Sequence, residues 1–301
     1  MIDGFKQYIK ALLNHVNRYT GVALKDDPAI MGWETGNELN GVSANWTSHI
    51  ADFIKLELGA KQLVFDGIDS ERLGGVAKLD PAELAAESVD CYTDHYYPPR
   101  PAMLVASAAA AHAAGKVFYV GEFAWTGDGL DLFLTTVEQT RACTASLYWS
   151  LFPHADDHGF VSHGDGFTLH WPGDTPSQQI SVARLRAHAY AMRGMAVPPL
   201  PPPTGAPVLT SVAAPFLAWR GVAMAASYTV QRAAARVGPW TTICDACATD
   251  NDTPWRDSSR GTGTVFYRVR ANGGLERNAS VGSGPWSQTV ESPPPNASRV
   301  Q

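Results

Sequence analysis

Hydrophobic positions in the first 195 residues follow two spacings in turn, one typical of amphipathic helices and one typical of buried strands. Helical spacing is found over about residues 5–16, 47–58, 101–115, 130–141 and 179–192. The apolar runs between these helices read AIMGW, QLVFDG, SVDCYTDHYYP, KVFYVGEF and ASLYWSLF. Strands that alternate with helices indicate parallel βα units, so the pattern predicts an α/β fold.

Five predicted strands are fewer than a closed (β/α)8 barrel requires. Such a barrel has eight strands and usually about 250 residues. The pattern therefore leaves two interpretations: a smaller open sheet, or a barrel of which this chain contains only the last five units. Several of the strands end in polar or charged residues, as strands do at the active-site end of a barrel.

A proline-rich stretch, GMAVPPLPPPTGAP, follows the last predicted helix and cannot form a helix or a central strand. We therefore predict an α/β domain at 1–195, a linker at 196–206 and a separate domain at 207–291, followed by a disordered tail at 292–301. Only short strand patterns occur in 207–291, which predicts a small β-sandwich. This part resembles a fibronectin type III module in Trp219, Tyr228, Val230 and the stretch YRVRA.

Two glutamates stand at the ends of apolar strands, Glu38 in WETGNEL and Glu122 in YVGEF. In a parallel barrel, strand ends of this kind meet at one rim, so we expect the two carboxyl groups to face one another. Hydrolysis of a glycosidic bond needs such a pair, one group acting as acid and base and the other as nucleophile or base. Taken alone, Glu38 is more simply interpreted as a surface or helix-initiating acid.

Five stretches in this order and spacing resemble glycoside hydrolase family five: WETGNEL, TDHYYP, VGEFAWTG, YWSLFPH and WPGDTP. The resemblance covers about residues 1–195 and is greatest to the endo-β-1,4-mannanases. It implies a partial (β/α)8 TIM barrel, without a metal or organic cofactor, that cleaves internal β-1,4-mannosidic bonds by a retaining, two-glutamate double displacement. An endo-β-1,4-glucanase of the same family and a non-catalytic polysaccharide-binding remnant are the alternatives.

The resemblance also implies the roles of individual residues. Glu38 would be the acid/base and Glu122 the nucleophile. Four further residues are expected to bind substrate or to position these two glutamates. Asn37 would bind the sugar C2 hydroxyl, and Trp149 would be the platform under the reactive sugar. Tyr97 would donate a hydrogen bond to the nucleophile, and His95 is the fourth. His154 and Trp171 lie in the polar loop that follows the last strand, and we expect them to meet sugars.

The sequence also allows structural interpretations of some of these residues. His95 and Tyr97 taken singly are typical of packed core positions. Glu34 is predicted by strand alternation to point away from the site. Trp33 and Trp125 are either packing residues or walls of a sugar subsite. The histidines and aspartates of PHADDHGFVSHGDGF match no compact zinc signature, so no metal site is predicted there.

Composition limits the classes of binding partner that are expected. A net charge of -6 and a pI near 5.8 disfavour nucleic acid, and no apolar run approaches the roughly 18 residues of a membrane span. The expected partner is a β-mannan or β-glucan; the oligomeric state is open. Cys244 and Cys247 form a lone CxxC, either a small disulfide loop or two thiols.

An arginine and a histidine that the family takes from earlier strands have no counterpart after Met1. We therefore expect the catalytic part to be truncated at its N-terminus, with a signal peptide upstream of this chain in a secreted protein. We also expect the chain by itself to be poorly soluble and catalytically feeble.

Overall fold

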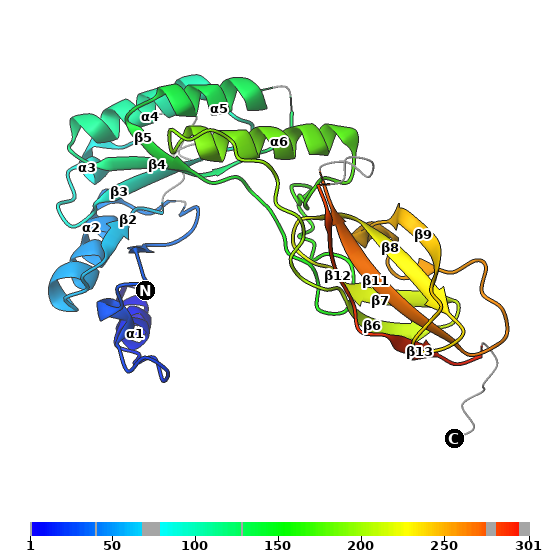
Figure 1. The fold of residues 1–301 in the computed structure, drawn as a ribbon. Helices are drawn as coiled ribbons and strands as arrows, with labels where there is room; N and C mark the ends of the chain where they lie inside the picture. Colours follow the sequence, from blue (N-terminus) through cyan, green and yellow to red (C-terminus); the bar gives the residue numbers. More distant parts are fainter. Residues whose placement is uncertain (1, 40, 68–78, 128, 275–280, 295–301) are drawn as a thin grey trace. The chain divides into compact units, whose positions relative to one another are not determined.

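The computed structural model describes residues 2–39, 41–67, 79–127, 129–274 and 281–294 (Figure 1). The chain divides into two compact units, Met1–Trp149 and Ser150–Gln301. The segment 150–195 thus groups with the residues that follow it, whereas the pattern predicts a boundary in the proline-rich stretch. The predicted domain limits stay a prediction, and most of the predicted tail lies outside the described residues.

A five-stranded parallel sheet forms the centre of the first unit, with the strand order β1-β2-β3-β4-β5. The strands are β1 (Gly32–Glu34), β2 (Leu63–Phe65), β3 (Cys91–Tyr96), β4 (Val117–Phe123) and β5 (Cys143–Ser146). They correspond to the five apolar runs in the sequence. Within the described ranges, β1 and β5 each pair on one side only, so the sheet is open.

The helices of this unit are α1 (Ile2–Leu13), α2 (Ala44–Asp52), α3 (Pro81–Leu84), α4 (Pro101–Ala113) and α5 (Leu130–Gln139), with short turns η1 (Leu24–Asp26) and η2 (Phe53–Glu57). Helix α2 begins three residues earlier than predicted because the Ser43 hydroxyl accepts a hydrogen bond from the Trp46 amide and caps the helix. No described helix is long and apolar enough to cross a membrane.

Helices α4 and α5 lie together on one face of the sheet (Figure 1). The ring of Phe133 on α5 packs 5.4 Å from Tyr96 and 5.2 Å from Phe123, measured between ring centroids. All three side chains are almost completely buried. This packing fixes which side of β3 and β4 faces the helices, and therefore which side chains point to the other face of the sheet.

The other face of the sheet forms an open apolar concavity of about 520 Å³. Its lining includes Met31, Leu63, Phe65, Val117 and Leu147. Met31 is 72% exposed and Leu147 is 56% exposed, unusually high values for large hydrophobic side chains at a sheet. An apolar surface of this kind needs a covering partner, as the inner face of a closed barrel has.

The second unit contains helix α6 (Pro176–Ala191) and two antiparallel sheets. A capping box starts α6, because Thr175 and Gln178 satisfy one another's backbone amides. The first sheet has the order β10-β7-β6, from Trp255–Arg256, Phe216–Arg220 and Val208–Ala213. The second has the order β12-β11-β8-β9, from Ser283–Trp286, Val265–Gly273, Ala225–Ala233 and Thr241–Ala248, with β13 (Val290–Ser292) also paired to β11.

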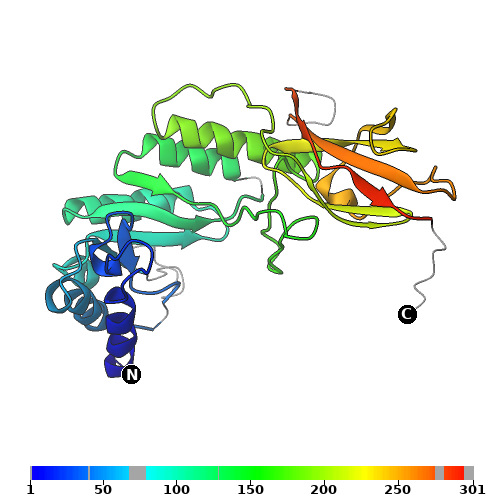
Figure 2. The same ribbon diagram turned by 60° about the horizontal axis from the view of Figure 1, so that its bottom comes forward.

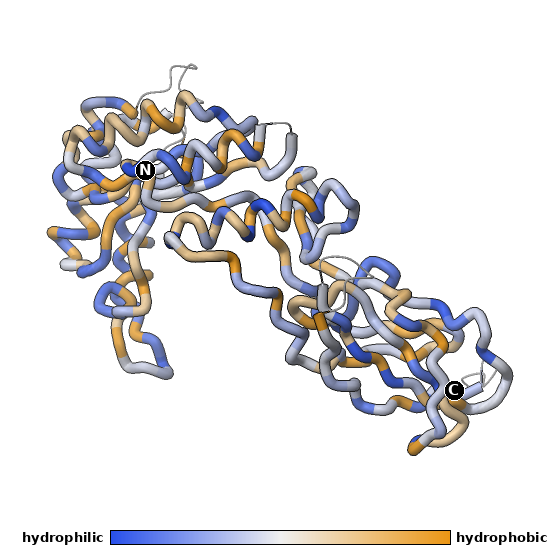
Figure 3. The backbone as a smooth tube through the Cα atoms, turned by 45° about the horizontal axis from the view of Figure 1, so that its top comes forward, coloured by the Kyte–Doolittle hydropathy of each residue, from blue (hydrophilic) through white to orange (hydrophobic). Residues whose placement is uncertain are grey.

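Figure 2 shows the strands of these two sheets as separate layers. Between them lies a core that includes Trp219, Tyr228, Val230, Tyr267 and Val269. Figure 3 shows hydrophobic and hydrophilic residues interspersed along this unit. Buried and half-buried positions alternate along β11 from Phe266 to Ala271, as expected for a sheet with one buried face. The CxxC of β9 forms a disulfide between Cys244 and Cys247, which selects the first of the two predicted states.

Candidate active site

Glu122 stands near the carboxyl end of β4, where the strand contains one extra residue. Register runs Asp94 to Val120 and then His95 to Glu122, so Gly121 forms a β-bulge. A Cβ at Gly121 would lie 2.2 Å from Thr93 Oγ1 and 2.8 Å from His95 Nε2. Glycine is therefore required for β4 to approach β3 this closely and for the bulge to direct Glu122 to the face away from the helices.

Glu38 is held by a loop that follows β1 and is hydrogen-bonded to the end of β2. The Gly67 amide donates to Thr35 Oγ1 (3.1 Å), and the Leu39 amide donates to the Gly67 carbonyl (2.9 Å). Between these contacts the backbone of Glu38 has φ of 48°, in the left-handed region that non-glycine residues seldom adopt. Such strain is typical of residues held in place for function.

His95 lies between the two glutamates. Its Nδ1 is 3.0 Å from Glu38 Oε1 and 3.6 Å from Glu122 Oε2. One carboxylate oxygen of each glutamate and the histidine nitrogen all lie within 4.8 Å of one another. His95 is only 5% exposed, whereas the two carboxyl side chains are about one-fifth exposed (22% and 19%). Two solvent-reachable carboxyl groups thus face each other above a buried histidine.

Tyr97 and Trp149 complete this end of the sheet. The Tyr97 hydroxyl donates a 2.7 Å hydrogen bond to Glu122 Oε2. The Trp149 amide donates to the Phe123 carbonyl (3.1 Å), and Trp149 forms a bridge with Ala124, two residues after Glu122. Asn37 is exposed and directly precedes Glu38. The predicted residues of the first unit therefore lie in the loop after β1, at the end of β3 and just after it, on β4, and in the segment after β5.

Glu34 departs from the expectation that it points away from the site. It lines the concave face of the sheet, where Tyr119 donates a 3.2 Å hydrogen bond to its Oε1. Burial raises the pKa of Glu34; the hydrogen bond from Tyr119 and the charge of His95 oppose this, and the charge of Glu122 adds to it. Glu34 is therefore electrostatically coupled to the pair. The prediction from strand alternation was wrong for two reasons. The chain leaves β1 after Glu34, so Glu38 does not continue the alternation of that strand, and the bulge in β4 changes the direction of Glu122.

Trp33 and Trp125 were each predicted to be either a packing residue or a wall of a sugar subsite. Their contacts and burial favour packing. The indole Nε1 of Trp33 donates to Gln62 Oε1 (3.0 Å). Trp125 is only 6% exposed. Both are better explained by packing than by stacking on a sugar.

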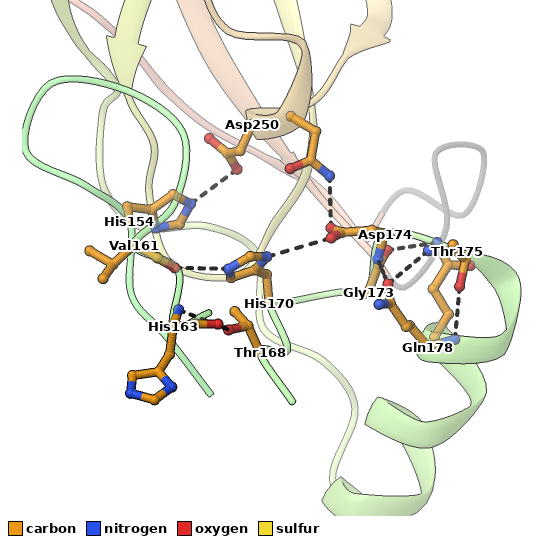
Figure 4. Close-up of polar contacts among 12 residues, drawn as sticks. His154, Val161, His163, Thr168, His170, Gly173, Asp174, Thr175, Gln178 and Asp250 are labelled. Carbon is orange, nitrogen blue, oxygen red and sulfur yellow. Dashed lines mark hydrogen bonds and ion pairs between the residues drawn. The ribbon is translucent and has the colours of Figure 1, made fainter. Parts of the chain in front are cut away.

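His154 and Trp171 lie in the second unit, and their described contacts are within it. Figure 4 shows His154 beside Asp250. His154 Nε2 is 3.0 Å from Asp250 Oδ2, and its ring stacks on Phe160. Trp171 lines a cavity of about 280 Å³ together with Phe160, Asp174 and residues of the β9–β10 connection. Their predicted contact with the reacting sugar stays a prediction.

The histidines of this loop pair with separate aspartates. His158 contacts Asp157 at 3.2 Å and His163 contacts Asp165 at 2.9 Å. Burial lowers the pKa of His170, but the contacts with Asp174 and the Val161 carbonyl outweigh it, so this pKa is raised overall (Figure 4). These histidine–aspartate contacts stabilise the segment 157–174.

The three groups that do converge, Glu38, His95 and Glu122, are the set in the described part of the chain that could also ligate a metal ion. A carboxylate pair at this spacing has a second chemical use. Carboxyl groups about 5–5.5 Å apart characterise retaining glycosidases, whereas inverting enzymes hold them about 6.5–9.5 Å apart. The oxygen separation of at most 4.8 Å is nearer to the retaining value.

Residues 2–115 match the family model described as GH family 5 beta-mannosidase-like. The chain is 33% identical over 114 residues to mannan endo-1,4-beta-mannosidase 3 of Oryza sativa subsp. japonica, covering 31% of this chain and 24% of that protein. It is 29% identical over 116 residues to mannan endo-1,4-beta-mannosidase 4 of Solanum lycopersicum, covering 33% of this chain and 29% of that protein. The chain thus spans less than a third of these relatives' length.

Among solved structures, the endo-1,4-beta-mannanase from Rhizomucor miehei matches with a TM-score of 0.50 and 28% identity, over 64% of this chain and 62% of that one. The endo-beta-1,4-mannanase from Thermotoga petrophila matches with the same TM-score of 0.50, over 97% of this chain and 70% of that one. At 17% identity the second match concerns the fold alone. Both support the predicted partial barrel.

Proposed function

We propose that this GH5 mannanase-like chain contains the catalytic pair of a retaining glycosidase that cleaves internal β-1,4-mannosidic bonds. The observation that carries the proposal is the position of Glu38 and Glu122 around His95, with carboxylate oxygens no more than 4.8 Å apart. This spacing leaves no room for a water molecule behind the sugar, as inversion would require, and suits direct attack by a carboxylate.

In the first step Glu122 is the nucleophile. Its carboxylate attacks the anomeric carbon while Glu38 donates a proton to the departing glycosidic oxygen, which leaves a glycosyl ester on Glu122. The hydrogen bond from Tyr97 holds Oε2 of Glu122 in one orientation and stabilises its negative charge. Because Tyr97 donates to Oε2, the other oxygen, Oε1, is the one we assign to the attack.

In the second step Glu38 is the base. It removes a proton from water, which attacks the anomeric carbon, and Glu122 leaves as a carboxylate. His95 contacts both carboxyl groups and is itself buried, so it holds their separation fixed as charge passes from one to the other. The neutralisation of Glu122 in the ester makes Glu38 easier to deprotonate at the right moment.

The names of the relatives favour mannan over glucan. Asn37 precedes the acid/base and is proposed to bind the C2 hydroxyl, the position at which mannose and glucose differ. Reducing-sugar release from galactomannan, compared with release from carboxymethylcellulose, decides between the two; faster release from the cellulose derivative would favour the endo-glucanase. Secretion of the protein is part of the proposal.

One observation favours the non-catalytic alternative. Within the described ranges the sheet is open at β1 and β5, and its concave face is exposed. A polysaccharide-binding remnant would tolerate this, whereas efficient catalysis needs a supported site.

A mechanism-based label separates the alternatives. A 2-deoxy-2-fluoro-mannosyl inactivator with a good leaving group should esterify Glu122, and peptide mass spectrometry locates the added mass. Labelling of Glu122 supports the nucleophile assignment. Labelling of Glu38 or Glu34 in its place would contradict the assignment, and a folded protein that takes up no label would favour the remnant.

A further inference from the structure

A row of arginine and aromatic side chains lies on one face of the sheet β12-β11-β8-β9, within the second unit. We refer to it as the Arg–Trp row, and it consists of Arg236, Trp240, Phe266, Arg268, Arg270 and Trp286. Its central strand is β11, on which Tyr267, Val269 and Ala271 are fully buried in the sandwich core. By alternation, the three members on β11 point to the opposite face of the sheet.

The arginines of the row stack on the rings. The Cζ atom of Arg268 is 4.4 Å from the ring centroid of Trp240 and also 4.4 Å from that of Trp286. The Cζ atom of Arg270 is 4.7 Å from the Trp286 centroid. The Cζ atom of Arg236, the end member of the row, is 5.8 Å from the centroid of Phe266. Contacts at these distances are cation–π interactions.

These guanidinium groups have no acidic partner within the described part of the second unit. Nε and Nη2 of Arg268 both donate to the neutral Gln231 Oε1, at 2.9 Å and 2.7 Å. The adjacent Arg232, by contrast, forms a 2.6 Å ion pair with Asp257. Arg268 and Arg270 both stack on Trp286, so two like charges are held close together. Burial, together with the positive charge of Arg270, lowers the pKa of Arg268. An anion bound here would relieve that repulsion.

Stacking also decides what kind of ligand suits the row. Ring surface that contacts guanidinium groups is not open to the C–H face of a neutral sugar. The guanidinium N–H groups are fixed by the rings, so binding a carboxylate costs less side-chain entropy than it would for free arginines. Arg268 and Arg270 are two residues apart on one strand face, about 7 Å, so they present repeated positive charge.

We propose that the Arg–Trp row is a second binding site, for a carboxylate-bearing polysaccharide of the polyuronate class. The guanidinium fork binds carboxylates through two parallel hydrogen bonds. The choice of polysaccharide over another polyanion rests on the proposed function, in which the chain acts on glycans. The net charge of -6 makes non-specific attraction of polyanions unfavourable, so binding must come from a local feature.

Sodium polygalacturonate is the probe, and its dissociation constant is measured by isothermal titration calorimetry on the whole chain at low and at high salt. We expect binding that weakens as salt rises, and none of comparable strength for neutral galactomannan at this face. Arg268→Gln combined with Arg270→Gln should weaken polygalacturonate binding by about tenfold or more. The control pair, Arg220→Gln with Arg256→Gln, removes equal charge from the other sheet and should leave binding within about twofold.

Melting curves establish whether each variant is folded. If the double variant is not folded, Arg270→Gln alone replaces it, because Arg268 then still stacks on Trp240 and Trp286. The Glu122→Gln variant should bind polygalacturonate as the parent does, so failure of the catalytic proposal and failure of this one are distinguishable. The proposal is overturned if the parent does not bind polygalacturonate, or if both double variants lose binding equally. It is also overturned if a single-stranded oligonucleotide binds the row more tightly.

Discussion

The Tyr97 hydroxyl and Glu122 Oε2 are joined by a 2.7 Å hydrogen bond that links the segment after β3 to the end of β4. Tyr97→Phe should lower kcat by about 10- to 100-fold with little change in KM, because the bond orients the nucleophile more than it binds substrate. Tyr8→Phe removes an exposed hydroxyl from α1 and should leave both constants unchanged. An unaltered kcat in Tyr97→Phe would show that the contact is incidental.

The two glutamates should respond differently to removal. Glu122→Gln should reduce turnover by about 10³-fold or more, because no ester can form. Glu38→Ala should also be slow, but azide should restore part of its rate on a substrate with a good leaving group, since the anion replaces the water that Glu38 activates. Glu57→Gln is the control, an exposed acid paired with Lys6. Azide rescue of the Glu122 variant alone would reverse the two roles.

Gly121 is predicted to position His95 and Glu122. Gly121→Ala places a methyl group against Thr93 and His95, so kcat should fall by about tenfold or more while the protein still folds. Gly129→Ala is the matched control, since a Cβ there meets nothing within 4 Å. Adding Thr93→Ala to Gly121→Ala removes one of the two clashes and should recover part of the rate. Full activity in Gly121→Ala would contradict the positioning role.

The bulge at Gly121 also marks the limit of what the sequence could predict. Tyr119 and Glu122 are three residues apart, so simple alternation puts them on opposite faces, yet the extra residue places both on the concave face. The five strands and their parallel arrangement could be predicted because each strand is a distinct apolar run between helical patterns. A one-residue irregularity, or the hydrogen bonds that turn the chain after β1, leave no periodic signal.

The second unit shows a similar contrast. The buried positions of the sandwich follow from alternation, and Trp219, Tyr228 and Val230 are in its core as their pattern suggests. The contact between His154 and Asp250 joins positions 96 residues apart and depends on tertiary structure alone. The same is true of the Arg–Trp row, whose members come from β11, β12 and the connection between β8 and β9.

Glu83 should make stability depend on pH. It is 3% exposed, and burial together with the charges of Asp66 and Asp80 raises its pKa to about 7. The folded state therefore holds this proton more tightly than the unfolded state, and the free energy of unfolding should fall as pH rises from about 4.5 to about 7. The upper bound of this loss is about 3 kcal/mol.

Glu83→Gln should flatten this dependence, raising the melting temperature at neutral pH relative to the parent and changing it little near pH 4.5. The exposed Glu87→Gln variant serves as control and should keep the slope of the parent. Identical pH profiles for the parent and Glu83→Gln would refute the assignment.

The open sheet should limit the chain when it is produced alone. Among the described residues, β1 and β5 each leave one edge without a pairing strand, and one face of the sheet is apolar and exposed. Both features favour association with other chains, so we expect poor solubility and slow hydrolysis of galactomannan. Joining βα units of the Rhizomucor miehei mannanase ahead of Ile2 should improve both, measured by light scattering and reducing-sugar release. Hydrolysis by residues 1–301 at the rate of that mannanase would disprove the expectation.

The left-handed backbone conformation of Glu38 lowers the stability of the fold. With φ at 48°, a glycine or asparagine would fit the turn better and would make the fold more stable, by roughly 1 kcal/mol. Replacing Glu38 by glycine would therefore relieve this backbone cost and at the same time remove the carboxyl group that faces His95. The carboxyl group thus occupies this position at a cost in folding free energy, and the proposed role of Glu38 in catalysis gives that cost a reason.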